Sequence, residues 1–238
     1  MLGYFYGIDL MYIVLVLPAI IFSVIAQAKV KSSYKKYGKV LSARGLTGAM
    51  AAQMILRQHG LNLPVNCIAG ELTDHYDPKA NVINLSSGVY NGTSVASIGI
   101  AAHEVGHAIQ YAENYGPVRL RMAIIPVTQV ASKLAFPLVI AGLILSSFSA
   151  FWIDLAYVGI IAFGLAVFFQ LVTLPVEFNA SSRAVSNINE MGILTEDELK
   201  GTKKVLTAAA LTYVASLAVS LMQLLRLIIM VSGSDRRR

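Results

Sequence analysis

Four long apolar stretches constrain the fold of this chain more than any other feature. They cover about Gly3–Gln27, Ile124–Ser147, Phe151–Leu174 and Val205–Val231. A helix needs about 20 mainly apolar residues to cross the hydrocarbon core of a bilayer, and each stretch is long enough to do so. Only 13% of the residues are charged, whereas a soluble domain averages about 25%. The sequence therefore predicts a multi-pass protein of the cell membrane with about four transmembrane helices.

The first apolar stretch is similar to a secretion signal because it ends in Ala26-Gln27-Ala28, a sequence typical of cleavage sites. It has no basic residues ahead of its apolar part, however, and it carries Asp9. We therefore expect a retained membrane anchor over residues 1–28. The second and third stretches are separated only by Phe148–Ala150, which predicts a transmembrane helical hairpin over residues 123–174.

Two more polar segments, residues 29–122 and 175–204, interrupt the apolar stretches, and residues 205–238 form a last apolar segment with a basic tail. The first polar segment has the pattern of a small α+β domain. The elements expected in it are a helix over Leu46–His59, short strands over Val65–Leu72 and Asn81–Leu85 with a polar turn at Asp77-Pro78 between them, and a helix over Val95–Asn114 that Thr93 or Ser94 can cap.

The pentapeptide His103-Glu104-Val105-Gly106-His107 carries the most specific chemical signal. Residues four apart lie on the same face of a helix, so the two histidines can direct ring nitrogens at one metal ion. The glutamate follows the first histidine, where it can reach a water bound to that metal. This is the pattern of zinc metalloproteases, in which the glutamate acts as the general base.

A catalytic zinc ion normally has three protein ligands and one open position, so a third donor is required. A further histidine at the spacing used by metzincins is absent, because Ala108–Glu113 follows the motif. His59 and His75 lie upstream in less regular surroundings. Glu177 is the best candidate, at the beginning of an expected helix after the third apolar stretch. Two membrane spans separate it from the histidine motif, so the chain returns both to the same side of the bilayer.

The net charge of +6 does not indicate binding to nucleic acid, because no basic patch is interleaved with aromatic residues. The basic residues gather beside apolar stretches, as expected for contact with anionic lipid headgroups.

Since lysine concentrates on the cytoplasmic side of membrane proteins, the polar segments are expected to face the cytoplasm. Arg236–Arg238 would then lie outside and Arg226 would lie in lipid, which leaves the orientation of the last segment open. The lysines concerned are Lys29, Lys31, Lys35, Lys36, Lys39, Lys200, Lys203 and Lys204.

The histidine motif, the segment Pro175–Ser181 and the order of apolar stretches resemble the bacterial YugP-type zinc membrane peptidases. More distantly, the chain is similar to the HtpX and CAAX prenyl protease group of membrane gluzincins. The resemblance covers essentially the whole chain and implies a zincin-like domain in which His103, His107 and Glu177 hold Zn²⁺ and Glu104 is the catalytic base. Many gluzincins carry an aspartate four residues after the third ligand, which supports a histidine. Ser181 stands at that position here, so Asn179 or a backbone carbonyl is the expected substitute.

The expected activity is hydrolysis of peptide bonds in membrane proteins or membrane-associated peptides by a zinc-activated water. The strand near Asn81–Ser86 is expected to offer an exposed edge to which an extended substrate adds as a further strand. The sequence does not choose an oxyanion donor among Arg183, His75, Tyr90 and Tyr111. It also leaves the oligomeric state open.

Two alternatives compete with this interpretation. In the first, Val95–Ala112 itself spans the bilayer, as in site-2-type intramembrane proteases; no Asp-Gly signature in the later stretches supports this. In the second, the protein is a non-enzymatic adaptor stabilised by zinc. The presence of Glu104 argues against an adaptor, because a structural zinc site needs no general base.

Overall fold

The structure, a computed structural model, describes residues 10–235. Residues 1–9, which include Asp9 and the start of the first apolar stretch, lie outside the described residues, as do Arg236–Arg238. The chain divides into two compact units. Among the described residues, unit 1 comprises residues 10–25, 120–173 and 213–235, and unit 2 comprises residues 26–119 and 174–212.

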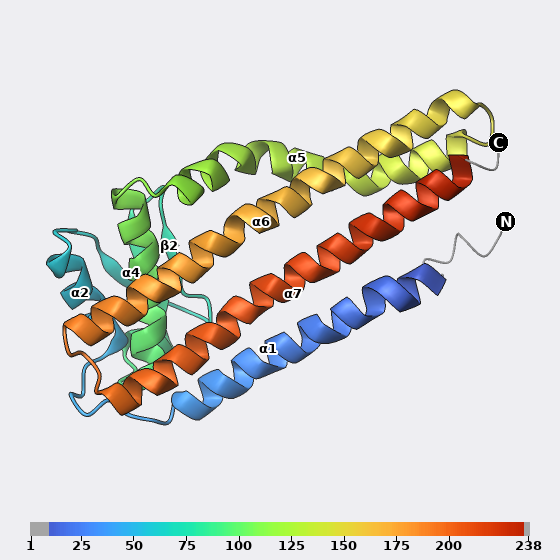
Figure 1. The fold of residues 1–238 in the computed structure, drawn as a ribbon. Helices are drawn as coiled ribbons and strands as arrows, with labels where there is room; N and C mark the ends of the chain where they lie inside the picture. Colours follow the sequence, from blue (N-terminus) through green and yellow to red (C-terminus); the bar gives the residue numbers. More distant parts are fainter. Residues whose placement is uncertain (1–9, 236–238) are drawn as a thin grey trace. The chain divides into compact units, whose positions relative to one another are not determined.

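Helices dominate the chain, and three short strands lie between the second and third α-helices (Figure 1). The elements in chain order are a π-helical turn η2 (Tyr12–Val16), α1 (Leu17–Tyr37), α2 (Gly48–Gln58), β1 (Val65–Ile68), β2 (His75–Asp77), β3 (Val82–Ser86), α3 (Ser87–Tyr90), α4 (Val95–Ala112), α5 (Gly116–Leu145), the 3₁₀ turn η3 (Ala150–Trp152), α6 (Ile153–Glu190) and α7 (Glu196–Asp235).

Four helical segments are long and apolar enough to cross a membrane: Tyr12–Tyr37, Gly116–Leu145, Ala150–Glu190 and Glu196–Ser234. They contain the described parts of the four predicted apolar stretches except residues 10–11 and 146–147. Together with the small sheet, they confirm the predicted α+β class with about four transmembrane helices.

The expectation that Glu177 begins a separate helix is wrong. Helix α6 continues from the third apolar stretch through Pro175 as far as Glu190. A proline inside a helix removes one backbone donor, but neighbouring packing can maintain the helix around it. Val176 and Ala180 are buried immediately after the proline and hold this part of α6 in unit 2. The change from apolar to polar sequence therefore marks a change of surroundings and not a helix boundary.

Close helix packing characterises unit 1. A Cβ atom added to Gly159 of α6 would lie 2.7 Å from the carbonyl oxygen of Ala135 in α5, so only glycine permits this approach. Arg226, the costly cation predicted within the last apolar stretch, is buried in unit 1. Its guanidinium carbon lies 5.4 Å from the centroid of the Tyr12 ring, a cation–π arrangement that stabilises a desolvated positive charge.

The three-stranded sheet of unit 2 has the order β1-β3-β2. Strand β3 pairs in parallel with β1 (Val65↔Ile83) and antiparallel with β2 (Tyr76↔Ile83). The prediction that Asn81–Ser86 forms an exposed edge is therefore wrong, because β3 is the central strand. The edge strands are β1 and β2, and β2 lies where the sequence predicted a polar turn. Its three polar residues show no apolar alternation, and the strand depends on pairing with β3 rather than on its own propensity.

Helix α4 lies in the core of unit 2. Ser94 caps its first turn by accepting a hydrogen bond from the backbone N–H of Ser97, which confirms the predicted start of this helix. Its apolar face, including Ile98 and Ile109, is buried with Ile55 of α2 and Ile83 of β3. Fully burying such a side chain stabilises the fold by about 1.5–3 kcal/mol. This packing fixes the rotation of α4 about its axis and hence the direction of its opposite face.

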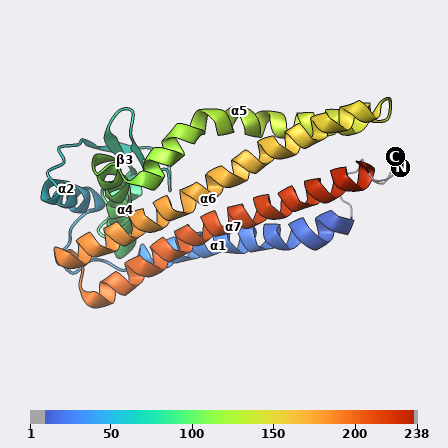
Figure 2. The ribbon, with the colours of Figure 1, turned by 45° about the horizontal axis from the view of Figure 1, so that its top comes forward.

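The C-terminal part of α6 runs beside α4 (Figures 1 and 2). The two helices meet at Gly106, where an added Cβ atom would lie 2.6 Å from the carbonyl oxygen of Ala180. Ala180, Ala184 and Ile188 are fully buried along the same side of α6. The small residues allow the two backbones to approach closely, and this brings side chains of α6 over the histidine face of α4.

Candidate metal centre

Helix α4 places the two motif histidines one turn apart on a single face. The ring centroids of His103 and His107 lie 4.8 Å apart, with the ring planes inclined at 81°. Both side chains are largely buried. The Nε2 atoms of the two rings face the same point beside α6, as the spacing of the motif predicts.

Glu177 of α6 supplies the third donor at this point. Its Oε2 atom lies 3.5 Å from the Nε2 atom of His103 and 3.5 Å from that of His107. A tetrahedral zinc site with bonds of about 2.0–2.1 Å separates its ligand atoms by about 3.3 Å. Two imidazole nitrogens and a carboxylate oxygen at this spacing fit a zinc ion as the donor set of a catalytic site. Within residues 10–235, this is the one group of three such side chains whose donor atoms converge.

Glu104 lies beside the three converging side chains and is not one of them. Its side chain is buried, and its Oε2 atom accepts a hydrogen bond of 2.9 Å from the backbone N–H of Tyr76 in β2. Because Tyr76 belongs to the edge strand, this contact places the carboxylate between the histidine face of α4 and the sheet. The sequence analysis assigned Glu104 its role without locating this backbone partner.

The Ser181 hydroxyl occupies the position where related enzymes carry an aspartate, and it contacts a histidine directly. Its Oγ atom lies 3.1 Å from the Nδ1 atom of His103. The expectation that Asn179 or a backbone carbonyl replaces the aspartate is therefore wrong. A hydroxyl is long enough to reach the ring because α4 and α6 approach closely at Gly106.

Gln110 supports the other histidine, and the sequence analysis missed it. Its Oε1 atom lies 3.0 Å from the Nδ1 atom of His107, and its side chain is fully buried. Its Nε2 atom donates to the carbonyl oxygen of Val176 at 2.8 Å and to Oδ1 of Asn179 at 2.9 Å. A signal was available in the sequence, because Gln110 follows His107 by three residues and shares its helical face.

The remaining candidates from the sequence lie in other surroundings. His59 caps the end of α2 and contacts Asn187 at 2.6 Å, and His75 contacts Asn84 across β2 and β3 at 3.0 Å. Neither histidine joins the converging group. Arg183 forms an ion pair of 2.7 Å with Glu113.

Two aromatic candidates for an oxyanion donor have contrasting positions. The ring of Tyr111 packs edge-on against that of Tyr76, with centroids 5.3 Å apart. The backbone N–H of Tyr76 contacts Glu104, so Tyr111 lies on the side of the sheet strand that faces Glu104. Tyr90 packs instead against the core of unit 2. The arrangement therefore favours Tyr111 over Tyr90.

Neighbouring charges shift the pKa values of His107 and Glu113. Burial lowers the pKa of His107, but the Glu177 and Glu104 carboxylates and the contact with Gln110 outweigh burial and raise it above the ordinary 6.5. The Arg183 guanidinium holds the pKa of Glu113 below its ordinary 4.5. The site thus attracts positive charge, which suits a cation-binding position.

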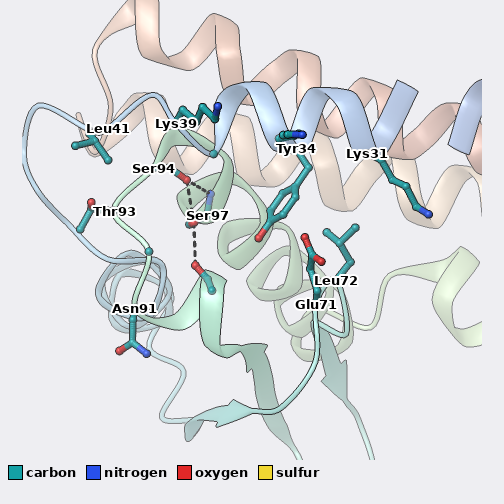
Figure 3. A pocket seen from close by; sticks show the side chains of 14 residues that line it. Lys31, Tyr34, Lys39, Leu41, Glu71, Leu72, Asn91, Thr93, Ser94 and Ser97 are labelled. Carbon is teal, nitrogen blue, oxygen red and sulfur yellow. Dashed lines mark hydrogen bonds between the residues drawn. The ribbon is translucent and has the colours of Figure 1, made fainter. Parts of the chain in front are cut away.

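A separate cavity of about 940 Å³ lies elsewhere in unit 2 (Figure 3). It lies between the end of α1 and the loop preceding α4, with Lys31, Tyr34, Glu71 and Ser94 among its lining residues. The Ser94 hydroxyl in this cavity acts as the cap of α4. None of the three converging side chains lines it, so the cavity is distinct from the metal centre.

Helix α4 is not among the four candidate spans found in the described residues 10–235. Most of its side chains are buried within unit 2, in contact with α2 and the sheet. This position favours a folded domain over the alternative in which α4 crosses the bilayer.

Sequence comparisons agree with this geometry. The family described as "Putative neutral zinc metallopeptidase" matches residues 12–232. The chain is also 49% identical over 228 residues to the "Putative membrane protease YugP" of Bacillus subtilis (strain 168), an alignment that covers 95% of this chain and 99% of the relative. No solved structure matches the chain. The matched range includes α4 and all of α6, and the similarity confirms the resemblance inferred from the motifs.

Proposed function

We propose that this chain, which belongs to the neutral zinc metallopeptidase family, is a membrane-bound endopeptidase acting on membrane or membrane-associated proteins. The observation that carries the proposal is the convergence of His103, His107 and Glu177 on one point. The location of the protein in a membrane follows from its four long apolar helices and from its membrane-protease relative. Its substrates would therefore be polypeptides that reach the membrane surface.

The three converging side chains would hold the zinc ion of this family through two Nε2 atoms and a carboxylate oxygen. Zinc bound in such a site lowers the pKa of a coordinated water to about 7 and polarises a carbonyl group. Three protein ligands leave the fourth position open for that water. The separation of the three donor atoms needs little adjustment to suit an ion of this size.

Glu104 is proposed as the general base. Its carboxylate would take the proton of the attacking water and later pass it to the leaving amine. The Tyr76 backbone N–H donates to one of its oxygens, Oε2, and leaves the other, Oε1, for the water. This contact would hold the carboxylate in one orientation beside the metal position.

The outer edge of β2 is proposed as the substrate-binding strand. Within the described part of the chain, β2 pairs only with β3, so its other edge is open to an added strand. The Tyr76 N–H points away from β3 on this side, where it is already bonded to Glu104, so an added strand would pair with the remaining backbone groups of this edge. An extended peptide lying along β2 would therefore pass the base and the metal position together.

The catalytic region is assigned to residues 29–122 together with residues 175–204, and its cytoplasmic location is part of the proposal. Lysines in the C-terminal part of α1 and near the start of α7 support that side of the membrane. Both groups belong to unit 2, which also contains the metal centre.

The decisive test of the function compares the purified wild-type protein in detergent with a Glu104→Gln variant. The variant keeps all three metal ligands, so it should retain bound zinc and lose hydrolysis of a membrane-protein or peptide substrate by at least about a hundredfold. Glu190→Gln, the same change at an exposed residue of α6, is the matched control and should retain full activity. Unchanged hydrolysis in Glu104→Gln would refute the assigned base. If zinc is bound but the wild type shows no hydrolysis, the adaptor alternative is favoured.

A further inference from the structure

We propose that Gln110, Asn179 and Arg183 form a hydrogen-bond chain that fixes the tautomer of His107 and directs the lone pair of its Nε2 atom at the metal position. The inference rests on the proposed metal centre but concerns residues that do not bind the metal. It assigns Gln110 as a positioning residue for His107.

The chain begins at Arg183, whose guanidinium has only donors. Its Nε atom lies 2.7 Å from Oδ1 of Asn179, so that atom of Asn179 must be the acceptor. The amide of Asn179 therefore cannot be flipped without placing a donor against a donor. Two contacts hold Arg183 in place. The first is the ion pair of 2.7 Å with Glu113, and the second is stacking over the Tyr115 ring, with 6.0 Å from the guanidinium carbon to the ring centroid.

The second step fixes the amide of Gln110. One end of this amide lies 2.9 Å from Oδ1 of Asn179 and 2.8 Å from the carbonyl oxygen of Val176. Both partners are acceptors, so this end must be the NH₂ group. The other end, which faces His107, must then be the carbonyl oxygen Oε1. The burial of Gln110 excludes water that could satisfy a flipped amide.

The third step fixes the imidazole of His107. Its Nδ1 atom lies 3.0 Å from Oε1 of Gln110, which is an acceptor. Nδ1 must therefore carry the proton, and in the neutral ring Nε2 must carry the lone pair. That lone pair faces the Oε2 atom of Glu177 at 3.5 Å. Two electron-rich atoms directed at each other favour a cation between them, so the chain prepares the site to receive one.

His103 provides an internal contrast. Its Nδ1 atom contacts the hydroxyl of Ser181, which can either donate or accept a hydrogen bond. This contact is compatible with both tautomers of His103. Of the two motif histidines, only His107 belongs to a hydrogen-bond network that ends at the Arg183 guanidinium. Because that group can donate but not accept hydrogen bonds, it sets the donor and the acceptor in every bond of the network. Loss of Gln110 should therefore affect His107 more than loss of Ser181 affects His103.

The test uses ¹⁵N NMR of the full-length, zinc-free protein in detergent, with the pH raised until the His107 ring signals stop changing, because the pKa of His107 lies above the ordinary 6.5 and the neutral ring must be observed. The chain has only four histidines, so substitution of each histidine in turn assigns every ring signal. In the wild type, His107 should show a protonated Nδ1 and an unprotonated Nε2. Gln110→Met removes the acceptor at similar volume and should yield a mixture of tautomers. It should also weaken zinc binding by about 10- to 100-fold in competition with a chelator.

Two further variants make the outcome specific. Asn187→Ala removes another buried amide of α6, which contacts His59 and the backbone of Arg183. It should alter the His59 signal and leave both the His107 tautomer and zinc affinity unchanged. Asn179→Asp keeps the acceptor between Arg183 and Gln110 and should behave as the wild type, whereas Asn179→Leu should partly release the tautomer. The Asn179 pair decides the question if Gln110→Met does not fold.

The proposal is overturned if wild-type His107 carries its proton on Nε2, or if neither Gln110→Met nor Asn179→Leu changes its tautomer. These spectra require neither zinc nor hydrolysis. A wild-type protein that binds no zinc would contradict the proposed function, while the zinc-free spectra would still decide whether the chain fixes His107.

Discussion

The Nε2 atom of His107 lies 3.5 Å from the Oε2 atom of Glu177, although the two apolar stretches Ile124–Ser147 and Phe151–Leu174 separate these residues in the sequence. The contact exists because α6 continues as one helix into unit 2 and meets α4 at Gly106. The position of the proposed third ligand therefore depends on the packing of two helices rather than on a local motif. The predictions below test that packing, the contacts around the histidines and the proposed base.

Gly106→Ala should disturb the metal centre without changing a ligand. The new Cβ atom would lie 2.6 Å from the backbone oxygen of Ala180, so α6 would have to move away from α4. Such overpacking typically costs about 1–3 kcal/mol, which exceeds the gain of about 1 kcal/mol from alanine's helix propensity. We expect a lower thermal unfolding midpoint and weaker zinc binding. Gly116→Ala is the control, because a Cβ atom there meets nothing within 4 Å. Equal zinc affinity in both variants would contradict the importance of this contact.

Substitutions at Ser181 should tune the zinc affinity in opposite directions. Ser181→Ala removes the hydroxyl 3.1 Å from Nδ1 of His103 and should weaken zinc binding by about tenfold, the lower end for such supporting contacts. Ser181→Asp supplies a carboxylate, which raises the basicity of the histidine ligand, and should tighten binding. Chelator competition measures both effects. A weaker affinity in Ser181→Asp than in Ser181→Ala would show that the hydroxyl does not play this supporting role.

Tyr76→Pro should impair hydrolysis while leaving zinc in place. Proline removes the backbone N–H that donates to Glu104, and an edge strand tolerates proline where its N–H points away from its partner strand. We expect a lower kcat with unchanged zinc content. Tyr76→Phe retains the N–H and the ring, and it should remain close to wild-type activity. If the proline variant kept full kcat, orientation of Glu104 by this backbone group would be ruled out.

The ion pair between Glu113 and Arg183 should make part of the stability depend on pH. The pKa of Glu113 is lowered by Arg183, so this contribution is complete above the ordinary pKa of 4.5 and is lost as the pH falls through the lowered value. The Glu113 side chain is half exposed, so the contribution should stay below about 1 kcal/mol. Thermal unfolding of the wild type and Glu113→Gln should differ at pH 7 and converge under strong acid. A constant difference at every pH would contradict the assignment.

The sequence predicted those parts of the fold and site that depend on local pattern. Spacing within α4 placed His103 and His107 on one face, and Ser94 marked the start of the helix. The strand β2 was missed because its polar residues depend on pairing with β3. The passage of α6 through Pro175 was missed because proline normally signals a helix boundary.

Contacts between helices were the least predictable part of the site. The sequence indicates Glu177 by its place at the start of an expected helix after the third apolar stretch, whereas Gln110 resembles any buried helical residue until its partners are known. The contact between Ser181 and His103 likewise depends on how closely Gly106 lets α6 approach. Such relationships arise from three-dimensional packing, for which a single sequence carries no periodic signal.

The most direct test of the central claim is the zinc content of the purified wild-type protein beside that of Glu177→Ala, measured by elemental analysis after dialysis against a weak chelator. Circular dichroism of both proteins establishes that the variant retains its helical structure. If His103, His107 and Glu177 jointly hold the metal, the wild type should keep about one zinc ion per chain and the variant should lose most of it. Full zinc occupancy in a folded Glu177→Ala variant would contradict the account.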